Sequence, residues 1–209
     1  MVTCAMKQNQ DIVSEVDIKA LLTSPLEIKL QIIKQIGNFY KSGNFSDEQK
    51  KAAERILTSL IKESDVEVKK NISDAVKDSD NLSNDIAMTL AQDINIVAVP
   101  ILEFSKSLTD ENLIYIIKKA NDEEKEKSIS KRETVSEDVA HTLIETGHED
   151  VVATLLNNQG AEVSEDDYNT ILENFNETES VLSVLKQRAK LPLSIVKTLK
   201  EDFSEKLSD

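Results

Sequence analysis

The chain of 209 residues has no tryptophan, one cysteine, four glycines and three prolines. Sheets joined by many tight turns need glycine and proline, so their scarcity argues against an all-β fold. The single cysteine, Cys4, excludes a disulfide or a cysteine-based zinc site within one chain. No apolar run approaches the roughly 18 residues that span a bilayer, and the first residues lack the apolar core of a secretory signal. These absences predict a cytoplasmic protein, with export by a route that reads no N-terminal signal left open.

Positive charge is also scarce, because 39 acidic residues stand against 25 basic ones, for a net charge of −14. Such a chain is repelled by nucleic-acid phosphates and by anionic membranes. The densest basic segment, 118–132, has acidic residues interleaved through it, so we interpret it as a solvated face. Nucleic acid is therefore not an expected partner.

Aliphatic residues must build the core, because hydrophobic residues make up 39% of the chain and aromatic residues only 4%. This composition suits helices that are joined by short polar loops. The sequence has no Walker loop, no dinucleotide-binding glycine pattern and no nucleophile elbow. We therefore expect no catalytic residues and no cofactor.

A short sequence, VSED, occurs at 135–138 and again at 163–166, each time before a run of apolar residues. With the residue before each expected helix cap as an anchor, five anchors are spaced by 26, 27, 28 and 28 residues: Leu82, Leu108, Val135, Val163 and Leu191. The next residues suit a helix start, because serine and threonine accept bonds from free amides and proline lacks the amide: Ser83, Thr109, Ser136, Ser164 and Pro192. Acidic residues follow four of the five, where the helix dipole favours negative charge.

Apolar residues recur three, four, seven and eight positions after most of these caps, which is the stripe of an amphipathic helix. A shorter leading segment precedes each helix, near 66–76, 96–104, 123–129, 151–156 and 180–185. Neither helix of a pair can bury its stripe alone, so stacked pairs must share a continuous core. The pattern predicts an all-α fold, a right-handed α-solenoid of about five HEAT-like helix pairs of 26–28 residues.

The N-terminal part is helical without this spacing. Helices are expected over 16–22, 26–40 and 47–62, the last with a capping box formed by Ser46 and Gln49. We expect residues 1–12 to be disordered, 13–63 to form an N-terminal helical cap and 64–209 to form the repeats. No linker rich in proline, glycine or serine divides the chain, so 13–209 is predicted to be a single domain.

The third leading segment is the weakest of the five. Between residues 122 and 131, Ile129 is the only sizeable apolar residue. Because this segment has little apolar surface to bury, lower local stability is predicted there.

Three runs are similar to a known bacterial family: DIAMTLAQD (85–93), VAVPILEFSKSLTDENL (97–113) and VSEDVAHTLIETGHEDVVATLLNNQGAEVS (135–164). They resemble the alphaproteobacterial domain-of-unknown-function family 2336, which looks related to HEAT-type helical repeats. The resemblance covers roughly residues 16–200 and implies an α-solenoid without a particular activity. Family members often carry arginine before the caps, which Arg132 and Arg188 match, whereas Ser79, Ser105 and Gly160 do not.

The two histidines are candidate metal ligands. His141, Glu145 and His148 fall at i, i+4 and i+7, which would align two histidines and a carboxylate on one helix face. However, Gly147 is expected to end the helix before His148, and His141 occupies an outward position. We therefore interpret them as surface histidines and expect no metal ion.

Two positions of the repeat define candidate surfaces. The sixth residue after each cap could line a groove with hydroxyl groups, or pack against the next repeat, which we favour: Thr89, Tyr115, Thr142, Thr170 and Thr198. The fifth residue is Met88, Ile114, His141, Asn169 or Lys197. Met88 and Ile114 beside Tyr115 would form an apolar patch, or be scattered surface residues or contacts of the N-terminal helices. The candidate partner-binding residues are Met88, Ile114, Tyr115 and His141.

Two functions remain. The first is a non-catalytic protein-interaction scaffold or adaptor that binds a protein partner, for example a basic or amphipathic segment. A regulator or a secreted effector would be a variant of it. The second is a nucleic-acid-binding or base-processing HEAT-like enzyme, which would need a basic groove and stacking rings. Three arginines, no tryptophan and a net charge of −14 argue against the second.

Overall fold

The computed structural model describes residues 15–43, 46–63 and 65–205, which form thirteen helices. The expected disorder of 1–12 lies outside the described residues. The chain divides into two compact units, unit 1 (Met1–Leu108) and unit 2 (Thr109–Asp209). The single domain over 13–209 and the N-terminal cap over 13–63 stay predictions.

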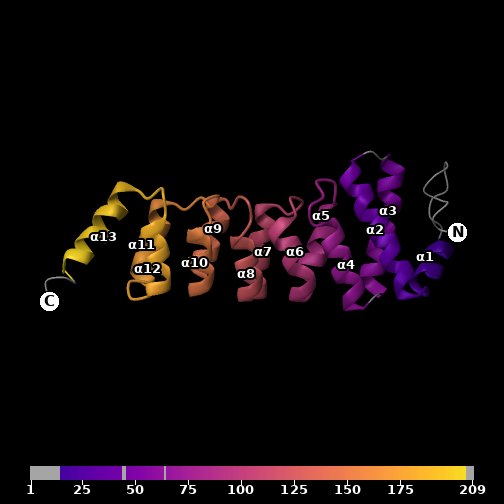
Figure 1. Cartoon of the computed structure of the whole chain (residues 1–209), viewed down its shortest axis with the longest axis horizontal. Coiled ribbons are helices and arrows are strands. Elements are labelled where there is room, and N and C mark those ends of the chain that lie inside the picture. Colours follow the sequence, from indigo (N-terminus) through magenta and orange to yellow (C-terminus); the bar gives the residue numbers. More distant parts are fainter. Residues whose placement is uncertain (1–14, 44–45, 64, 206–209) are drawn as a thin grey trace. The chain divides into compact units, whose positions relative to one another are not determined.

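The described part of unit 1 contains six helices: α1 (Glu15–Leu22), α2 (Leu26–Ser42), α3 (Asp47–Glu63), α4 (Val66–Val76), α5 (Asn84–Ala91) and α6 (Asn95–Phe104) (Figure 1). Its most extensive helix contacts join α2 to α4 and α4 to α6. The other helices form a second row, in which α3 packs against α1 and α5. Helices α2, α4 and α6 thus form one row in which each packs against the helix two places away along the chain, while α3 and α5 also pack closely against the helix that follows them.

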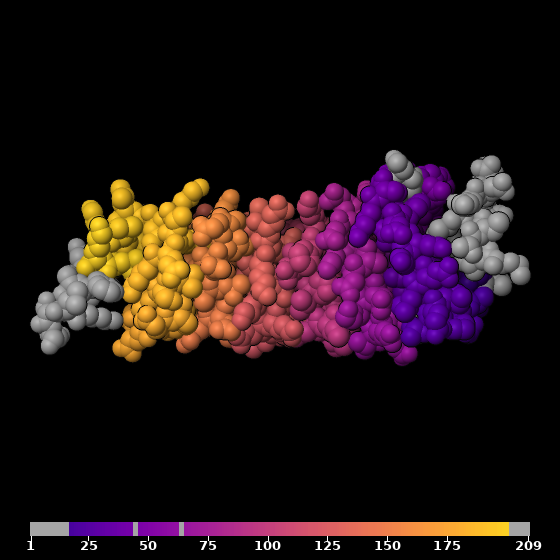
Figure 2. Space-filling model, in the orientation of Figure 1, coloured from indigo at the N-terminus to yellow at the C-terminus, as the bar shows by residue number. Residues whose placement is uncertain are grey.

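Unit 2 repeats this arrangement with seven helices in its described part: α7 (Asp110–Ala120), α8 (Glu123–Ser130), α9 (Glu137–Glu145), α10 (Glu149–Asn157), α11 (Glu165–Asn174), α12 (Glu179–Gln187) and α13 (Leu193–Glu205). One row consists of α8, α10 and α12, and the other of α7, α9, α11 and α13. Within each unit the atoms of neighbouring helices are closely packed on the face shown (Figure 2). The stacked helix pairs that the sequence predicted are present, and they are consistent with a helical repeat.

The second helices begin where the repeat spacing predicted. Helices α5, α7, α9 and α11 follow the predicted caps, and α13 follows Pro192. The hydroxyl of Ser164 accepts a hydrogen bond from the amide of Asp167 at 3.1 Å, and Ser136 caps α9 in the same way. Thr109 forms a reciprocal capping box with Asn112. The two VSED segments are therefore helix starts.

The predicted capping box of α3 is also present. The Ser46 amide donates to Gln49 Oε1 at 2.9 Å, and the Gln49 amide donates to Ser46 Oγ at 3.3 Å. At the predicted cap Ser83, in contrast, the side chain makes no capping bond.

The core consists mostly of aliphatic side chains on the facing sides of these helices. The largest fully buried side chains are Tyr40, Ile33, Ile36, Leu57, Leu60, Ile72, Leu90, Ile101, Leu102, Ile129, Leu143 and Ile144. Complete burial of one such side chain stabilises the fold by about 1.5–3 kcal/mol. No helix in the described part of the chain is long and apolar enough to cross a membrane.

Candidate interaction surface

The structure distributes the four sequence-predicted site residues over both units. Met88 lies on α5 in unit 1, whereas Ile114 and Tyr115 lie on α7 and His141 on α9 in unit 2. Helices α7 and α9 pack against each other, so the last three residues belong to neighbouring helices. Met88 and Ile114 are half-buried, while Tyr115 and His141 are exposed. Whether these residues bind a partner stays a prediction.

The exposed ring of Tyr115 is engaged by its own helix. Lys119 Nζ donates to the Tyr115 hydroxyl at 2.7 Å and lies 5.1 Å from the centre of its ring. An ammonium group near an aromatic ring is attracted to the negative face of that ring. The apolar character of Tyr115 is therefore partly masked by a lysine.

The threonine row has no free hydroxyl proton. Thr89, Thr142, Thr170 and Thr198 each donate to the carbonyl oxygen four residues earlier in the same helix. A hydroxyl group has one hydrogen to donate, so these groups could offer a ligand only their lone pairs. A row of hydroxyl donors along a groove is therefore not formed.

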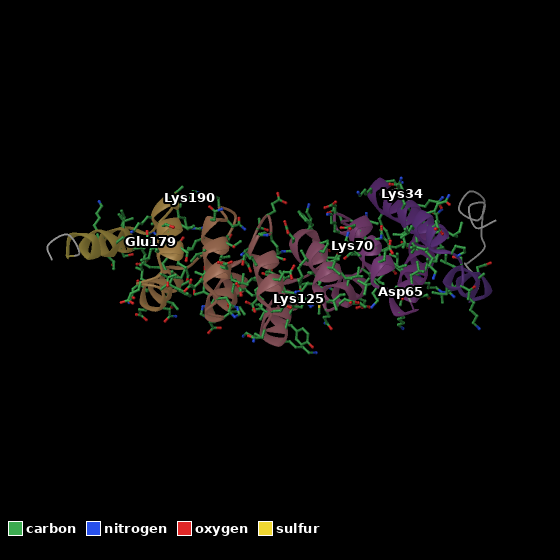
Figure 3. The ribbon with its side chains drawn as sticks, turned by 60° about the horizontal axis from the view of Figure 1, so that its bottom comes forward. Lys34, Asp65, Lys70, Lys125, Glu179 and Lys190 are labelled. Atoms are coloured by element: carbon green, nitrogen blue, oxygen red, sulfur yellow. The ribbon has the colours of Figure 1, made fainter. Side chains whose placement is uncertain are left out.

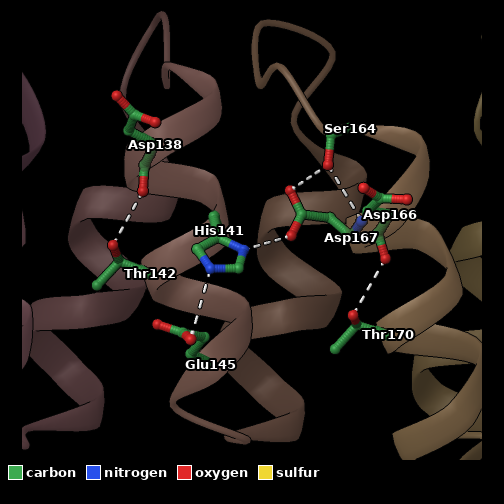
Figure 4. A network of polar contacts seen from close by, with 8 residues as sticks. All are labelled: Asp138, His141, Thr142, Glu145, Ser164, Asp166, Asp167 and Thr170. Carbon is green, nitrogen blue, oxygen red and sulfur yellow. Dashed lines mark hydrogen bonds and ion pairs between the residues drawn. The ribbon is translucent and has the colours of Figure 1, made fainter.

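His141 takes part in a polar network that joins α9 to α11 (Figure 4). Its Nδ1 lies 2.7 Å from Asp167 Oδ1, and its Nε2 lies 3.4 Å from Glu145 Oε1. Ser164 Oγ donates to Asp167 Oδ2 at 2.7 Å. The Asp167 side chain is only 3% exposed, whereas that of His141 is 55% exposed. The hydrogen bond to Asp167 is the main cause that raises the pKa of His141 above its ordinary value.

The order of contacts in this network does not suit nucleophilic catalysis. A serine nucleophile is activated by a base that takes its proton, with a carboxylate behind the base. Here Asp167 lies between Ser164 and His141, so the serine hydroxyl donates to the carboxylate. We interpret the network as a polar contact between two stacked helices.

The second histidine makes an equivalent contact in the opposite direction along the stack. His148, the N-cap of α10, places its Nδ1 2.6 Å from Glu126 Oε2 on α8. The Glu126 side chain is 1% exposed, and its Oε1 has no hydrogen-bond partner among the described residues. Thus α9 and α10 each hold a buried carboxylate of an adjacent helix pair through a histidine.

The possible metal set at 141–148 is not assembled. Helix α9 ends at Glu145, and Gly147 adopts a left-handed conformation with φ of 74° before His148 caps the next helix. This confirms the predicted helix end. Among the described residues, no group of three or more potential ligands is arranged to hold a metal ion.

The structure also places exposed apolar residues together at a site that the sequence analysis missed. We call this site the apolar edge. It consists of five of the eight large apolar residues that are exposed in the described part of the chain: Leu26, Ile28, Val66, Ile94 and Ile96. All five lie at the beginnings of α2, α4 and α6, which pack side by side.

Unit 2 differs at the corresponding helix starts. Helices α8, α10 and α12 begin with Glu123, Glu149 and Glu179, and all three are exposed. The difference is visible in the sequence. LEI begins α2, VEV begins α4, and NIV begins α6 directly after its N-cap Ile94, whereas EEK, EDV and ESV begin α8, α10 and α12. The apolar edge is thus specific to unit 1.

A family model described as "Uncharacterised protein conserved in bacteria (DUF2336)" matches residues 97–209. That span is more than half of the chain. The chain belongs to this family. The DUF2336 match includes all of unit 2 and most of α6, whereas the apolar edge lies entirely before it. Comparisons with curated proteins and with solved structures find no match.

Proposed function

We propose that this DUF2336 protein is a non-catalytic interaction scaffold that binds another protein through the surface of its helical repeats. The apolar edge carries the proposal, because five exposed aliphatic side chains gathered at three adjacent helix starts are costly to leave in water. Scattered surface hydrophobic residues need no explanation, but a concentrated group typically marks an interaction site.

We further infer that the helix pairs are HEAT-like and form a right-handed α-solenoid. The stacking of helices two apart within each unit supports this inference. Repeats of this kind bury a shared core between neighbouring pairs and leave the helix ends free to contact a partner. A cytoplasmic location and an alphaproteobacterial origin of the family belong to the same proposal.

The alternative is a nucleic-acid-binding or base-processing HEAT-like enzyme. A net charge of −14 disfavours it, since the counterion release that favours phosphate binding depends on lysine and arginine. Residues 97–209, which match the family, contain 24 acidic and 13 basic residues, so this part of the chain is strongly acidic.

Site-specific photo-crosslinking of the full chain in a bacterial cell tests the scaffold function. A photoreactive residue is placed at Ile96, at the sequence-predicted position Tyr115, or at the control position Leu193, which is 81% exposed. We expect a discrete adduct with another protein from Ile96 and none from Leu193. An adduct from Tyr115 alone would keep the scaffold function but move its site to α7. No adduct from any exposed position would contradict the function.

A further inference from the structure

We propose that the apolar edge of unit 1 docks one amphipathic helix of a protein partner, with lysine or arginine beside its apolar face. This inference rests on the scaffold function proposed above and gives it a site and a partner chemistry. The five side chains of the edge keep 37–51% of their surface exposed although they belong to well-packed helices. Their exposure is therefore a property of the folded unit.

Contacts between the helices fix the relative heights of the three starts. Gly37 on α2 faces Ala75 on α4, and Ile28 and Val66 lie nine residues before them, so these two side chains are at one level. Between α4 and α6, Lys69 bonds Asp93 and Ser73 bonds Val97, both pairs being 24 residues apart. Two contacts with the same offset mean that the helices are parallel. Val66 is level with residue 90, so Ile94 and Ile96 lie four and six residues further along, which is about one to two helical turns.

The dimensions of the apolar edge suit a helix. Packed helices lie about 8–10 Å apart, so the starts of α2, α4 and α6 span about 20 Å. A helix rises 1.5 Å per residue, so about 14 residues cross this distance. Apolar residues on one face of such a helix would meet the three starts in turn.

The charges around the apolar edge select a basic partner. Glu27, Asp65 and Glu67 are exposed between the apolar residues, and none of the ion pairs between described residues involves them. Figure 3 shows Asp65 at the start of α4. Lys69, on the same helix, is already bonded to Asp93 at 2.8 Å.

Two exposed or half-exposed cations, Lys62 and Lys29, lie near the apolar edge in sequence, so acids outnumber free bases there. A lysine or arginine that flanks the apolar face of a docked helix would meet these carboxylates. The same carboxylates would repel an anionic lipid surface. They would also repel the acidic surface of a second copy of this chain, whose net charge is −14.

Fluorescence anisotropy with the full chain and defined peptides tests the proposal. The probe is a labelled peptide of about 18 residues, made of leucine and lysine with the leucines on one helical face. A leucine and glutamate peptide of the same pattern tests the charge. A leucine and lysine peptide of scrambled order tests the amphipathic pattern. We expect saturable binding of the first peptide only.

Matched variants locate the binding site. Val66→Ser with Ile96→Ser should weaken binding of the leucine–lysine peptide at least about tenfold, whereas Leu193→Ser should leave it unchanged. Glu27→Gln with Asp65→Asn and Glu67→Gln should weaken binding at low salt and reduce its salt dependence. Circular dichroism checks that the helices of each variant are intact. We expect them to be, because all substituted side chains are exposed.

Several results would overturn the docking proposal. They are equal binding of the glutamate peptide, equal binding of the scrambled peptide, and unchanged binding to the Val66→Ser, Ile96→Ser chain. Sedimentation that shows self-association abolished by the same two substitutions would assign the apolar edge to a second copy. Binding to anionic vesicles abolished by them would assign it to a membrane. A crosslinked partner found from Tyr115 in the cell would still support the scaffold function, so the two failures are distinguishable.

Discussion

At the scale of single residues, His141 gives the fold a pH dependence whose sign follows from its contacts. The hydrogen bond to Asp167 is the largest cause that raises the pKa of His141, and burial opposes it. The negative charges of Asp167 and Glu145 raise this pKa further, while the positive charge of Lys118 lowers it. Because the pKa of His141 is raised in the folded state, its protonated form stabilises the fold. This stabilisation is complete at pH values below the unfolded pKa of about 6.5. This stabilisation is lost as the pH rises through the folded value.

We therefore expect the difference in unfolding free energy between the wild type and His141→Gln to be larger at about pH 6 than at about pH 8.5. Glutamine can still donate to Asp167 but does not titrate, so the variant keeps a bond and loses the pH dependence. Urea unfolding at both pH values measures the effect. Parallel stability profiles for the two proteins would show that His141 does not contribute.

Gly160 supports the close approach of two loops in unit 2. Its carbonyl oxygen accepts from the Val135 amide at 3.2 Å, and Val135 and Ala161 form an isolated parallel bridge. A Cβ at residue 160 would overlap the backbone carbonyl oxygen of Glu133. Because a backbone atom cannot yield easily, Gly160→Ala should destabilise the chain by about 2–3 kcal/mol.

The control for this prediction is Gly147→Ala, where φ is 74° and no atom lies within 4 Å of the added Cβ. Only backbone strain opposes that substitution, at about 1 kcal/mol. Thermal unfolding of both variants provides the comparison. Equal losses would mean that the loop at 160 moves away from Glu133 at little cost.

At the scale of helices, Arg188 stabilises the C-terminal end of α10 from the loop after α12. Its Nη1 donates to the carbonyl oxygens of Leu156 at 2.5 Å and Asn158 at 2.9 Å, and its Nη2 to that of Ala161 at 2.6 Å. Its Nε donates to the Tyr168 hydroxyl at 2.7 Å. The last carbonyl groups of a helix have no partner within the helix, so this guanidinium group supplies donors from outside.

We expect Arg188→Lys to destabilise the chain by about 2–4 kcal/mol. A single ammonium group cannot reach all four acceptors that the planar guanidinium group contacts. Tyr168→Phe removes only the Nε partner and should cost about 1 kcal/mol. Urea unfolding followed by circular dichroism measures both. A lysine variant as stable as the wild type would mean that charge alone is needed here.

Helix α8 has the smallest apolar contribution among the leading helices of unit 2. Ile129 is its one large buried apolar residue, and its other buried residues are polar: Lys125, Glu126, Ser128 and Ser130. Polar contacts such as that of Glu126 with His148 replace hydrophobic burial, and their net contribution is smaller. Amides in 125–131 should therefore exchange with solvent faster than those in 152–157 of α10. Uniformly slow exchange in α8 would contradict the prediction.

The helices were largely predictable from the sequence because their signals are local. The stripe of α4 was predicted over 66–76, and the helix has these bounds. The pairing of His148 with Glu126 was not predictable, since it depends on how two helix pairs stack across 22 residues of sequence. The apolar edge was missed for a related reason. In α6, almost every residue is apolar, so the sequence does not show that Ile96 faces solvent while Val97 is buried.

At the scale of the whole molecule, the larger excess of acidic residues and the apolar edge lie in different units. Residues 1–108 contain 16 acidic and 13 basic residues, against 23 and 12 in residues 109–209. The apolar edge belongs to the nearly balanced unit, and the strongly acidic unit has glutamates at the equivalent helix starts. The excess negative charge of unit 2 repels other acidic surfaces, and in the proposed function the apolar contact with a partner is made by unit 1.

This division of charge predicts how the chain responds to nucleic acid. A duplex attracts proteins by releasing counterions when lysine or arginine neutralises its phosphates, so affinity rises as salt is lowered. Acidic residues outnumber basic ones in both units, and Arg188 is engaged with four backbone and side-chain acceptors. We therefore expect no gel shift of duplex DNA even at low salt, where non-specific binding is strongest. A salt-sensitive shift would contradict the scaffold function and favour the nucleic-acid-binding alternative, because a net charge of −14 opposes attraction to phosphates.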